Sequence, residues 1–309
     1  MRQVLVTGAS GFIGRAVVTA FAKDGNMVRA AVRAVPQPPF DKGVVPIIHP
    51  DLTDPIDWQP LLAGIDIVIH LGGIAHIGGG VGPAVYDRVN RLATEQLAQA
   101  AAKAAVRRFV FVSSIRAQSG PSAGHDLTER DSECPIDPYG RSKLAAEQAV
   151  RSSGVPFTIL RPVLLYGLGV KGNFATLLRI ARSSWPLPLQ SFGNRRSLLG
   201  IENFISAITF ALDAPNTLGE TYIVADPGMA PSLAEMMVTL RKAQGRVARL
   251  FPMPTAALSV PLRLLGRGDL WQRIGGDLQA DPGKLISAGW RPKHSTKDGL
   301  TALALRITS

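Results

Sequence analysis

The sequence predicts an α/β fold in which a doubly wound parallel sheet is joined to a smaller C-terminal lobe. Two observations support this fold class. Short apolar segments typical of buried parallel strands alternate with longer amphipathic segments through the first half of the 309-residue chain. The first apolar segment, Val4–Val6, leads into a turn with three regularly spaced glycines and then into an apolar-periodic helical segment.

The glycine turn follows the first strand directly. Glycines let a backbone approach a pyrophosphate closely, and the free N–H groups at a helix N-terminus favour its charge. The Rossmann-type order of strand, glycine turn and helix therefore predicts a bound dinucleotide, and a glycine-rich turn without a ligand is the alternative. The residues expected to contact the cofactor here are Gly8, Gly11, Phe12, Ile13 and Gly14.

Composition narrows the class of protein. The net charge is +11, but the Lys and Arg residues are scattered and form no basic tail, so we do not expect nucleic-acid binding. The single cysteine, Cys134, excludes an internal disulfide and fits a reducing compartment. Neither a secretory leader nor an apolar run long enough to cross a bilayer is visible, so we expect a cytoplasmic protein. No metal site is expected.

The second predicted strand, Met27–Val32, bears on the choice of cofactor. An acidic residue at the end of this strand binds the ribose hydroxyls of NAD, whereas an arginine accommodates the 2′-phosphate of NADP. The chain has Arg33 there, and no acidic residue between Arg33 and Asp41. This favours NADP(H), with NAD as the alternative, unless Arg33 is only a solvated cation.

The third and fourth strands are predicted at Val44–Ile48 and Ile65–His70. After the third strand, Asp51 is expected to take the adenine amino group and Leu52 to pack on the ring; an Asx turn or a helix cap is an equal alternative for Asp51. After the fourth strand, the backbone is expected to approach the same cofactor at Leu71, Gly72 and Gly73.

A loop and a helix separate the fourth and fifth strands. The loop, Ala75–Pro83, begins near His76, which we expect to reach a substrate. A long amphipathic helix is predicted over Tyr86–Ala105, and Arg108–Val112 is the fifth strand. Five strands alternating with helices complete the evidence for a doubly wound sheet. His70, at the end of an apolar strand, is expected to be a core histidine.

The catalytic candidates follow the fifth strand. Ser114 lies at its carboxyl end, where open α/β sheets bind their ligands. Tyr139 and Lys143 are four residues apart in a predicted helix that begins at Pro138, so they share one face. A nearby ammonium and a positive nicotinamide favour the phenolate, so we expect Tyr139 to exchange a proton with a substrate oxygen. Lys143 is also expected to bind the nicotinamide ribose, and Ser114 to donate to that oxygen.

Four segments, TGASGFIG, DLTD, FVFVSSI and YGRSK, resemble the extended short-chain dehydrogenase/reductase family, whose members mostly act on nucleotide sugars. The resemblance covers about the first half of the chain. It implies that Ser114, Tyr139 and Lys143 form the family's catalytic triad and that Asp51 and the three glycines contact the cofactor. The segment VRAAVR resembles the NADP-using reductases, which agrees with the expectation for Arg33.

The second half of the chain is expected to hold the substrate. The sixth strand is predicted over Val155–Leu165, and the resemblance places Pro162 within it beside the nicotinamide. It also implies that Asn173, at the start of a helix, and Arg196 hold a diphosphate. Arg195 is an alternative to Arg196, and both could instead be surface arginines. Arg267 is a further phosphate candidate.

These elements predict two parts of the chain. The dinucleotide-binding domain comprises 1–166 and 197–222, and the substrate lobe comprises 167–196 and 223–309. We expect a helix over Asn203–Leu212, a strand over Thr221–Ala225, and a helix capped by Ser232. The segment Leu250–Ile274 is expected to pack in the lobe, with a peripheral membrane contact as the lesser alternative.

The tracts VKGNF, GNRRSL and YGRSKLAAEQA resemble bacterial reductases and 4-epimerases of UDP-linked sugars. The first hypothesis is an NADP(H)-dependent oxidoreductase that reduces a UDP-4-keto-6-deoxy-N-acetylhexosamine at C4, with Tyr139 supplying the proton. The alternative is a UDP-sugar 4-epimerase with tightly bound NAD, against which Arg33 argues. A dehydratase is disfavoured because Ile115 and Arg116 stand where such members carry Asp-Glu. A non-catalytic cofactor-binding protein is the least favoured function. The sequence is compatible with a homodimer.

Overall fold

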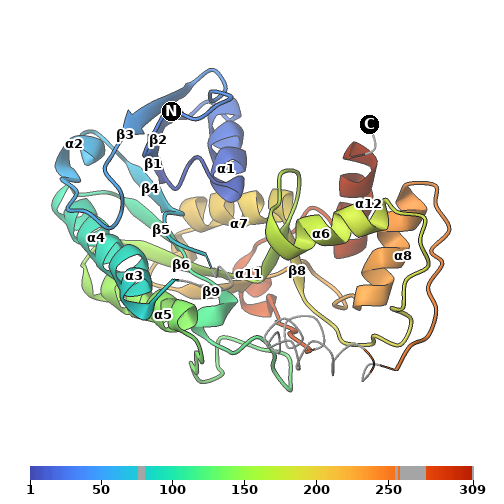
Figure 1. Ribbon diagram of the computed structural model, residues 1–309. Helices are drawn as coiled ribbons and strands as arrows, with labels where there is room; N and C mark the ends of the chain where they lie inside the picture. Colours follow the sequence, from blue (N-terminus) through green and yellow to red (C-terminus); the bar gives the residue numbers. More distant parts are fainter. Residues whose placement is uncertain (76–80, 255–256, 258–275, 308–309) are drawn as a thin grey trace.

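The computed structural model describes residues 1–75, 81–254, 257 and 276–307. A central sheet of seven parallel strands has the order β3-β2-β1-β4-β5-β6-β9 (Figure 1). Because helices cover both of its faces, its inner strands are almost continuously apolar and buried. The strands are β1 Gln3–Thr7, β2 Met27–Val32, β3 Val44–Ile48, β4 Ile67–His70, β5 Arg108–Val112, β6 Phe157–Pro162 and β9 Thr221–Val224.

Two layers of helices enclose this sheet. Helices α1, α7 and α11 pack in the apolar cluster on one face, and α2, α4 and α5 pack in the cluster on the other. The doubly wound fold predicted from the alternating segments is therefore confirmed. The bounds are α1 Phe12–Lys23, α2 Gln59–Leu62, α4 Ala93–Lys103, α5 Pro138–Ser152, α7 Ile201–Asp213 and α11 Gly283–Ala288.

Three predicted strands, β2, β3 and β5, have the predicted bounds, but the prediction of a single strand over Val155–Leu165 is wrong. The chain leaves the large sheet after Pro162, and a separate short strand, β7 Leu164–Tyr166, pairs with β8 Leu198–Gly200. The apolar run is continuous, so only the distant partner β8 reveals the break at Val163.

The predicted long helix over Tyr86–Ala105 is present in segments. It starts as α3 Pro83–Tyr86, passes through a π-helical segment, η1 Asp87–Leu92, and continues as α4. A π-helical turn adds one residue to the turn and often lies beside a functional site. In this chain, it contains the buried residue Asn90.

A third apolar cluster forms the smaller part of the molecule, to the right in Figure 1. It is built by α6 Gly172–Ala181, α8 Leu233–Ala243 and α12 Thr296–Arg306 together with β7 and β8. Ser232 caps α8 as predicted, in a capping box with Glu235. Leu285 and Trp290 lie within the predicted lobe range 223–309, yet they pack in the core of the large sheet.

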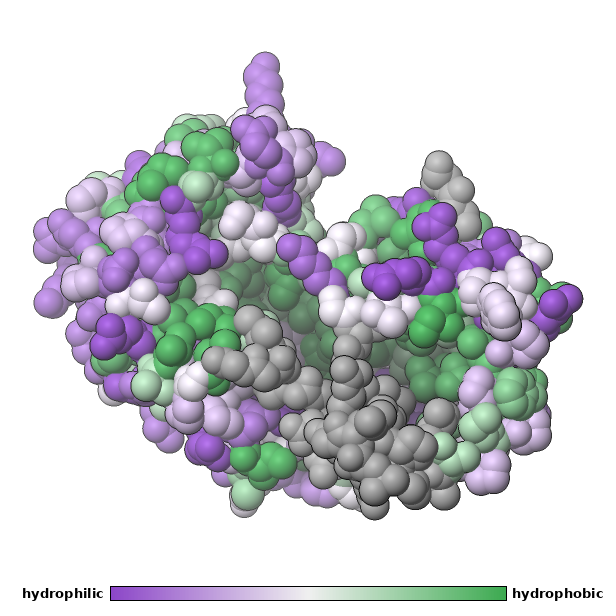
Figure 2. All heavy atoms as spheres, in the orientation of Figure 1, coloured by the Kyte–Doolittle hydropathy of each residue, from purple (hydrophilic) through white to green (hydrophobic). Residues whose placement is uncertain are grey.

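One buried carboxylate joins the two parts. Asp226 follows β9 and accepts hydrogen bonds from Tyr166 Oη at 2.8 Å, Asn203 Nδ2 at 2.7 Å and the Gly200 amide at 3.0 Å. These donors come from β7, α7 and β8 respectively, so the carboxylate ties the short sheet to the large one. Figure 2 shows a hollow between the two parts whose floor carries apolar residues.

Two further findings apply to the described residues alone. Within these ranges, no helix combines the length and the apolar character needed to cross a membrane. Nor does the described part of the chain gather three or more His, Cys, Asp or Glu side chains where they could hold a metal ion.

Candidate active site

The three catalytic candidates meet at the carboxyl end of β5. Ser114 follows this strand, and its side chain hydrogen-bonds Tyr139 on the first turn of α5. One turn further along, Lys143 is buried, donates from Nζ to the carbonyl oxygen of Val112 at 2.7 Å, and lies 4.4 Å from the ring centroid of Phe111. The predicted constellation is thus assembled in space as well as in sequence.

The electrostatics of this site differ from the prediction in one respect. Burial raises the pKa of Tyr139, and the hydrogen bond from Ser114 and the charge on Arg116 offset this only in part. Burial also lowers the pKa of Lys143 to about 8, against a smaller opposing effect of Glu147. Desolvation of Tyr139, which follows only from the tertiary structure, thus outweighs the charges that were expected to lower its pKa.

The glycine turn is packed as tightly as a phosphate-binding turn requires. Gly8 has a φ of +65°, and a Cβ there would lie 2.8 Å from the carbonyl oxygen of Leu71. A Cβ on Gly14 would lie 2.2 Å from the carbonyl oxygen of Gly8. Gly11 is the extended residue immediately before α1. Positions 8 and 14 therefore leave no room for a side chain, and glycines at these places are what a dinucleotide site needs.

Other cofactor candidates lie at or near the carboxyl edge of the sheet. The side chain of Phe12 lies against the backbone of Gly167, and Leu52 lies beside Gly72. Gly73 has a φ of +153°, and a Cβ there would lie 2.8 Å from the side-chain oxygen of Asn90. Pro162 ends β6 at the same edge of the sheet, and Ile13 packs against the core.

Arg33 and Asp51 form an ion pair, with 2.7 Å between Nη1 and Oδ2. The other oxygen of Asp51 accepts from the amide and hydroxyl of Thr53, both at 3.0 Å, which is the Asx turn expected as one alternative. These hydrogen bonds and the guanidinium lower the pKa of Asp51. Asp51 therefore offsets the positive charge that Arg33 brings to the end of β2.

His70 is the core histidine that the sequence predicts. It is fully buried, and its two ring nitrogens hydrogen-bond the hydroxyls of Thr7 at 2.6 Å and Thr94 at 2.8 Å. Burial lowers its pKa to about 3, so the ring is neutral. A neutral ring held between two hydroxyls is a structural group.

The two arginine candidates for the diphosphate point in different directions. Arg195 pairs with Glu235 at 2.9 Å and lines a cavity of about 990 Å³ between α8 and α12. Arg196 donates to the carbonyl oxygens of Pro121 and Gly276, and burial, followed by the nearby charge of Arg116, lowers its pKa to about 10. Only Arg196 is therefore brought close to the residues that follow β5.

Three substrate candidates lie wholly or partly outside the described residues. His76 and Arg267 lie outside the described residues. Asn173 is the second residue of α6, and its side chain is likewise outside the description.

Two buried polar groups near the site were not predicted from sequence. Asn90 Oδ1 accepts a hydrogen bond from the amide of Ile74. Its Nδ2 donates to the carbonyl oxygen of Ile74 and to Ser142 Oγ, the latter at 3.0 Å. Glu147, four residues after Lys143, is fully buried; it accepts from Ser113 Oγ at 2.6 Å and pairs with Arg161 at 2.6 Å. The Tyr139, Lys143 and Glu147 spacing on one helical face is the signal that could have indicated the second group.

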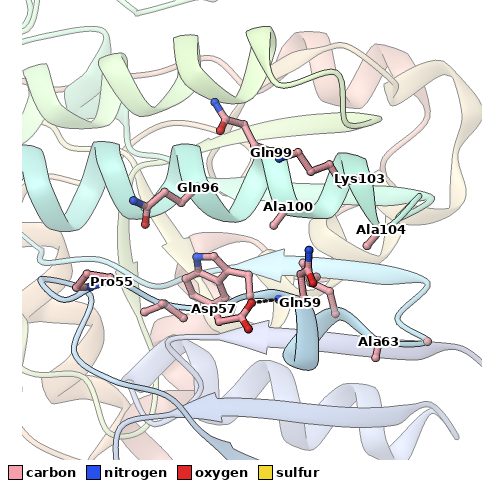
Figure 3. A pocket seen from close by; sticks show the side chains of 13 residues that line it. Pro55, Asp57, Gln59, Ala63, Gln96, Gln99, Ala100, Lys103 and Ala104 are labelled. Atoms are coloured by element: carbon pink, nitrogen blue, oxygen red, sulfur yellow. Dashed lines mark hydrogen bonds between the residues drawn. The ribbon is translucent and has the colours of Figure 1, made fainter.

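A separate cavity of about 560 Å³ lies between α2 and α4 (Figure 3). Pro55, Asp57, Gln96 and Lys103 are among its lining residues, and Asp57 Oδ1 accepts a hydrogen bond from the Gln59 amide at 3.0 Å. Since none of the predicted catalytic or cofactor residues lines it, this cavity is distinct from the candidate active site.

Comparisons with known proteins agree with this geometry. A family model described as "NAD dependent epimerase/dehydratase family" matches residues 4–225. A UDP-glucose 4-epimerase of Vibrio cholerae is 31% identical over 98% of this chain and 94% of its own length. The structure of MoeE5 with UDP-glucose and NAD is 25% identical, with a TM-score of 0.75, and covers 99% of this chain and 98% of its own. The structure of the UDP-glucuronic acid 4-epimerase of Bacillus cereus with NAD is 23% identical, with a TM-score of 0.78. It covers 99% of this chain and 96% of its own.

Proposed function

Because the chain belongs to the NAD-dependent epimerase/dehydratase family, we propose that it is a UDP-sugar 4-epimerase that uses NAD. The expectation of a C4 reductase came first from the sequence, but the relative that spans almost the whole chain carries the name of a 4-epimerase. This likeness supports the alternative over the reductase.

The observation that carries the proposal is the contact of Ser114 with Tyr139, beside Lys143, in a fold whose first strand leads into a tightly packed glycine turn. A bound nicotinamide would accept a hydride from C4 of the sugar and return it to the opposite face. Tyr139 takes the proton from the C4 oxygen as the hydride leaves and returns it at the end, so the residue is regenerated. Ser114 donates a hydrogen bond to the same oxygen and holds it beside Tyr139.

Lys143 and Arg196 have supporting roles in this proposal. Lys143 is held by Val112 and presents its ammonium one turn from Tyr139, where its charge stabilises the phenolate. The guanidinium of Arg196 donates to the backbone carbonyl oxygens of Gly276 and Pro121, and no carboxylate among the described residues pairs with it, so its positive charge stays available to the diphosphate of a nucleotide sugar.

The choice of NAD rests on the ion pair between Arg33 and Asp51. The guanidinium that could receive a 2′-phosphate is engaged by a carboxylate 2.7 Å away, which reduces its net attraction for that group. Two observations favour a second candidate: the side chain of Arg33 is 73% exposed, and no acidic residue stands at the end of β2. That candidate is an NADPH-dependent C4 reductase.

Identification of the cofactor released from the purified protein separates the two. The epimerase proposal expects tightly bound NAD and interconversion of a UDP-sugar with its C4 epimer without added cofactor. Protein isolated without a cofactor, which oxidises NADPH only in the presence of a UDP-4-keto sugar, would overturn it in favour of the reductase. The Tyr139→Phe variant is the matched control, since it should retain the cofactor and lose the turnover.

A further inference from the structure

The backbone that follows Ser114 is in direct contact with the start of the helix that carries Tyr139. The 3-10 turn η2, Ile115–Ala117, packs against the first turn of α5. A Cβ on Gly140 would lie 2.2 Å from the carbonyl oxygen of Arg116 and 3.0 Å from Pro135 Cβ. This close approach requires glycine at 140, so the relative position of the two segments is fixed without intervening side chains.

Asp137 adds a polar link across the same junction. It is the N-cap of α5, and its Oδ1 accepts from the Gly140 amide at 2.7 Å. Its Oδ2 accepts from Nη2 of Arg116 in an ion pair. Both side chains are less than one-fifth exposed, at 17% and 18%, so water screens this pair far less than a surface pair.

Arg116 closes the connection on the side of Ser114. Its backbone amide donates to Ser114 Oγ at 3.2 Å, while its side chain reaches Asp137. A continuous set of contacts therefore runs from the hydroxyl of Ser114, through Arg116 and Asp137, to the helix turn of Tyr139. Arg116 and Asp137 are themselves not among the catalytic candidates.

We propose that Arg116 and Asp137 are positioning residues whose ion pair holds the first turn of α5 against the end of β5, so that Tyr139 stays in contact with Ser114. The inference rests on the proposed function, because it assumes that Tyr139 carries the proton. It adds two residues that the triad of Ser114, Tyr139 and Lys143 does not include.

The pair also controls the charge around Tyr139, and this gives it a distinctive signature. Among the described residues, the titratable groups that face this phenol are Asp137, Arg116 and Tyr86, with Lys143 one turn along the helix. The carboxylate of Asp137 raises the pKa of Tyr139, and the guanidinium of Arg116 lowers it. Removal of one charge should therefore shift the titration of Tyr139 in the opposite direction from removal of the other.

The test compares Arg116→Met and Asp137→Asn with the wild type, each with its bound cofactor. We expect kcat for C4 epimerisation to fall about tenfold in Arg116→Met, with KM changed less than about twofold, because misplacement of the proton carrier affects the chemical step. Arg116→Lys should recover part of the rate. The acid limb of the kcat profile should move to higher pH in Arg116→Met and to lower pH in Asp137→Asn.

A matched control is Arg141→Met, which removes an exposed arginine of the same helix whose guanidinium donates to the carbonyl oxygen of Ile136. It should leave both rate and profile unchanged. Profiles that move in the same direction for both variants, or that match the Arg141→Met control, would overturn the proposal. If Arg116→Met does not fold, Asp137→Asn and Arg116→Lys are the variants that test the proposal. An acid limb of the kcat profile that stays in place in Asp137→Asn would then overturn the proposal.

A second readout separates this inference from the proposed function. The ultraviolet absorbance of tyrosinate can be titrated in each holoprotein against the same variant carrying Tyr139→Phe, and this needs no sugar substrate. Opposite shifts in a protein without epimerase activity would support the positioning pair and reject the proposed function. Active epimerase whose Tyr139 titration is the same in all variants would reject the pair and leave the function standing.

Discussion

Lys143 Nζ donates a hydrogen bond to the carbonyl oxygen of Val112 at 2.7 Å, while the Phe111 ring lies 4.4 Å from the same nitrogen. A cation is thereby held in a largely apolar place at the carboxyl end of β5. Burial lowers its pKa to about 8, well below the ordinary value of 10.5. The protein thus accepts an energetic cost to keep an ammonium beside Tyr139.

This cost predicts a pH dependence of stability. Between pH 8 and 10.5 the unfolded chain binds more protons at Lys143 than the folded one, so the stability of the wild type rises with pH across that range. In Lys143→Met this contribution is absent. The difference in free energy of unfolding between wild type and variant should change by about 2 kcal/mol in favour of the wild type from pH ~8 to pH ~10.

Urea unfolding at the two pH values measures this difference. Lys103→Met, which removes an exposed lysine of α4, is the matched control and should differ from the wild type by the same amount at both. A constant difference for Lys143→Met as well would mean that the ammonium is not desolvated in the folded protein.

The glycine cradle predicts a local intolerance of side chains. In Gly14→Ala the new methyl group would meet the Gly8 carbonyl oxygen at 2.2 Å, so α1 and the turn must separate. We expect a loss of roughly 1–3 kcal/mol of stability and release of the bound cofactor. Gly82→Ala, where a Cβ meets nothing within 4 Å, should retain both properties. Full cofactor retention in Gly14→Ala would show that the turn does not need close packing to bind it.

Arg33 predicts a change in cofactor preference. Its exposed ion pair with Asp51 contributes little to stability, less than about 1 kcal/mol, so Arg33→Ala should fold normally. The variant should bind NADP(H) about tenfold more weakly and NAD with little change, because the guanidinium interacts with the 2′-phosphate alone. Calorimetric titration of protein freed of cofactor measures both affinities.

Arg107→Ala removes a comparably exposed arginine, 3.8 Å from Asp66, and serves as the control for net charge. An equal loss of NAD and NADP(H) affinity in Arg33→Ala would instead assign the arginine to a group that both cofactors share.

The parts of the fold that could be predicted from sequence are those fixed by neighbouring residues. Apolar runs bounded by turns set β2, β3 and β5 to their observed bounds, and Ser232 marks the start of α8 through its own cap. The catalytic candidates were also found locally, because Tyr139 and Lys143 share a helix and Ser114 ends a strand.

The parts that could not be predicted depend on partners far away in the chain. The break at Val163 arises because β7 pairs with β8, more than thirty residues later. Arg195 and Arg196 are equivalent in sequence, and only their tertiary partners, Glu235 for one and Pro121 and Gly276 for the other, separate them. The pairing of Arg116 with Asp137 likewise follows from the docking of α5.

The most direct test of the account is incubation of the protein with a UDP-hexose such as UDP-glucose in deuterated water, followed by proton NMR. The account predicts that the C4 epimer accumulates without added cofactor and keeps its original hydrogen at C4, because the hydride returns to the carbon that it left while Tyr139 exchanges only the oxygen-bound proton. The Tyr139→Phe variant should convert the sugar at least about 100-fold more slowly. Deuterium at C4 of the product, or Tyr139→Phe turnover equal to that of the wild type, would contradict the account.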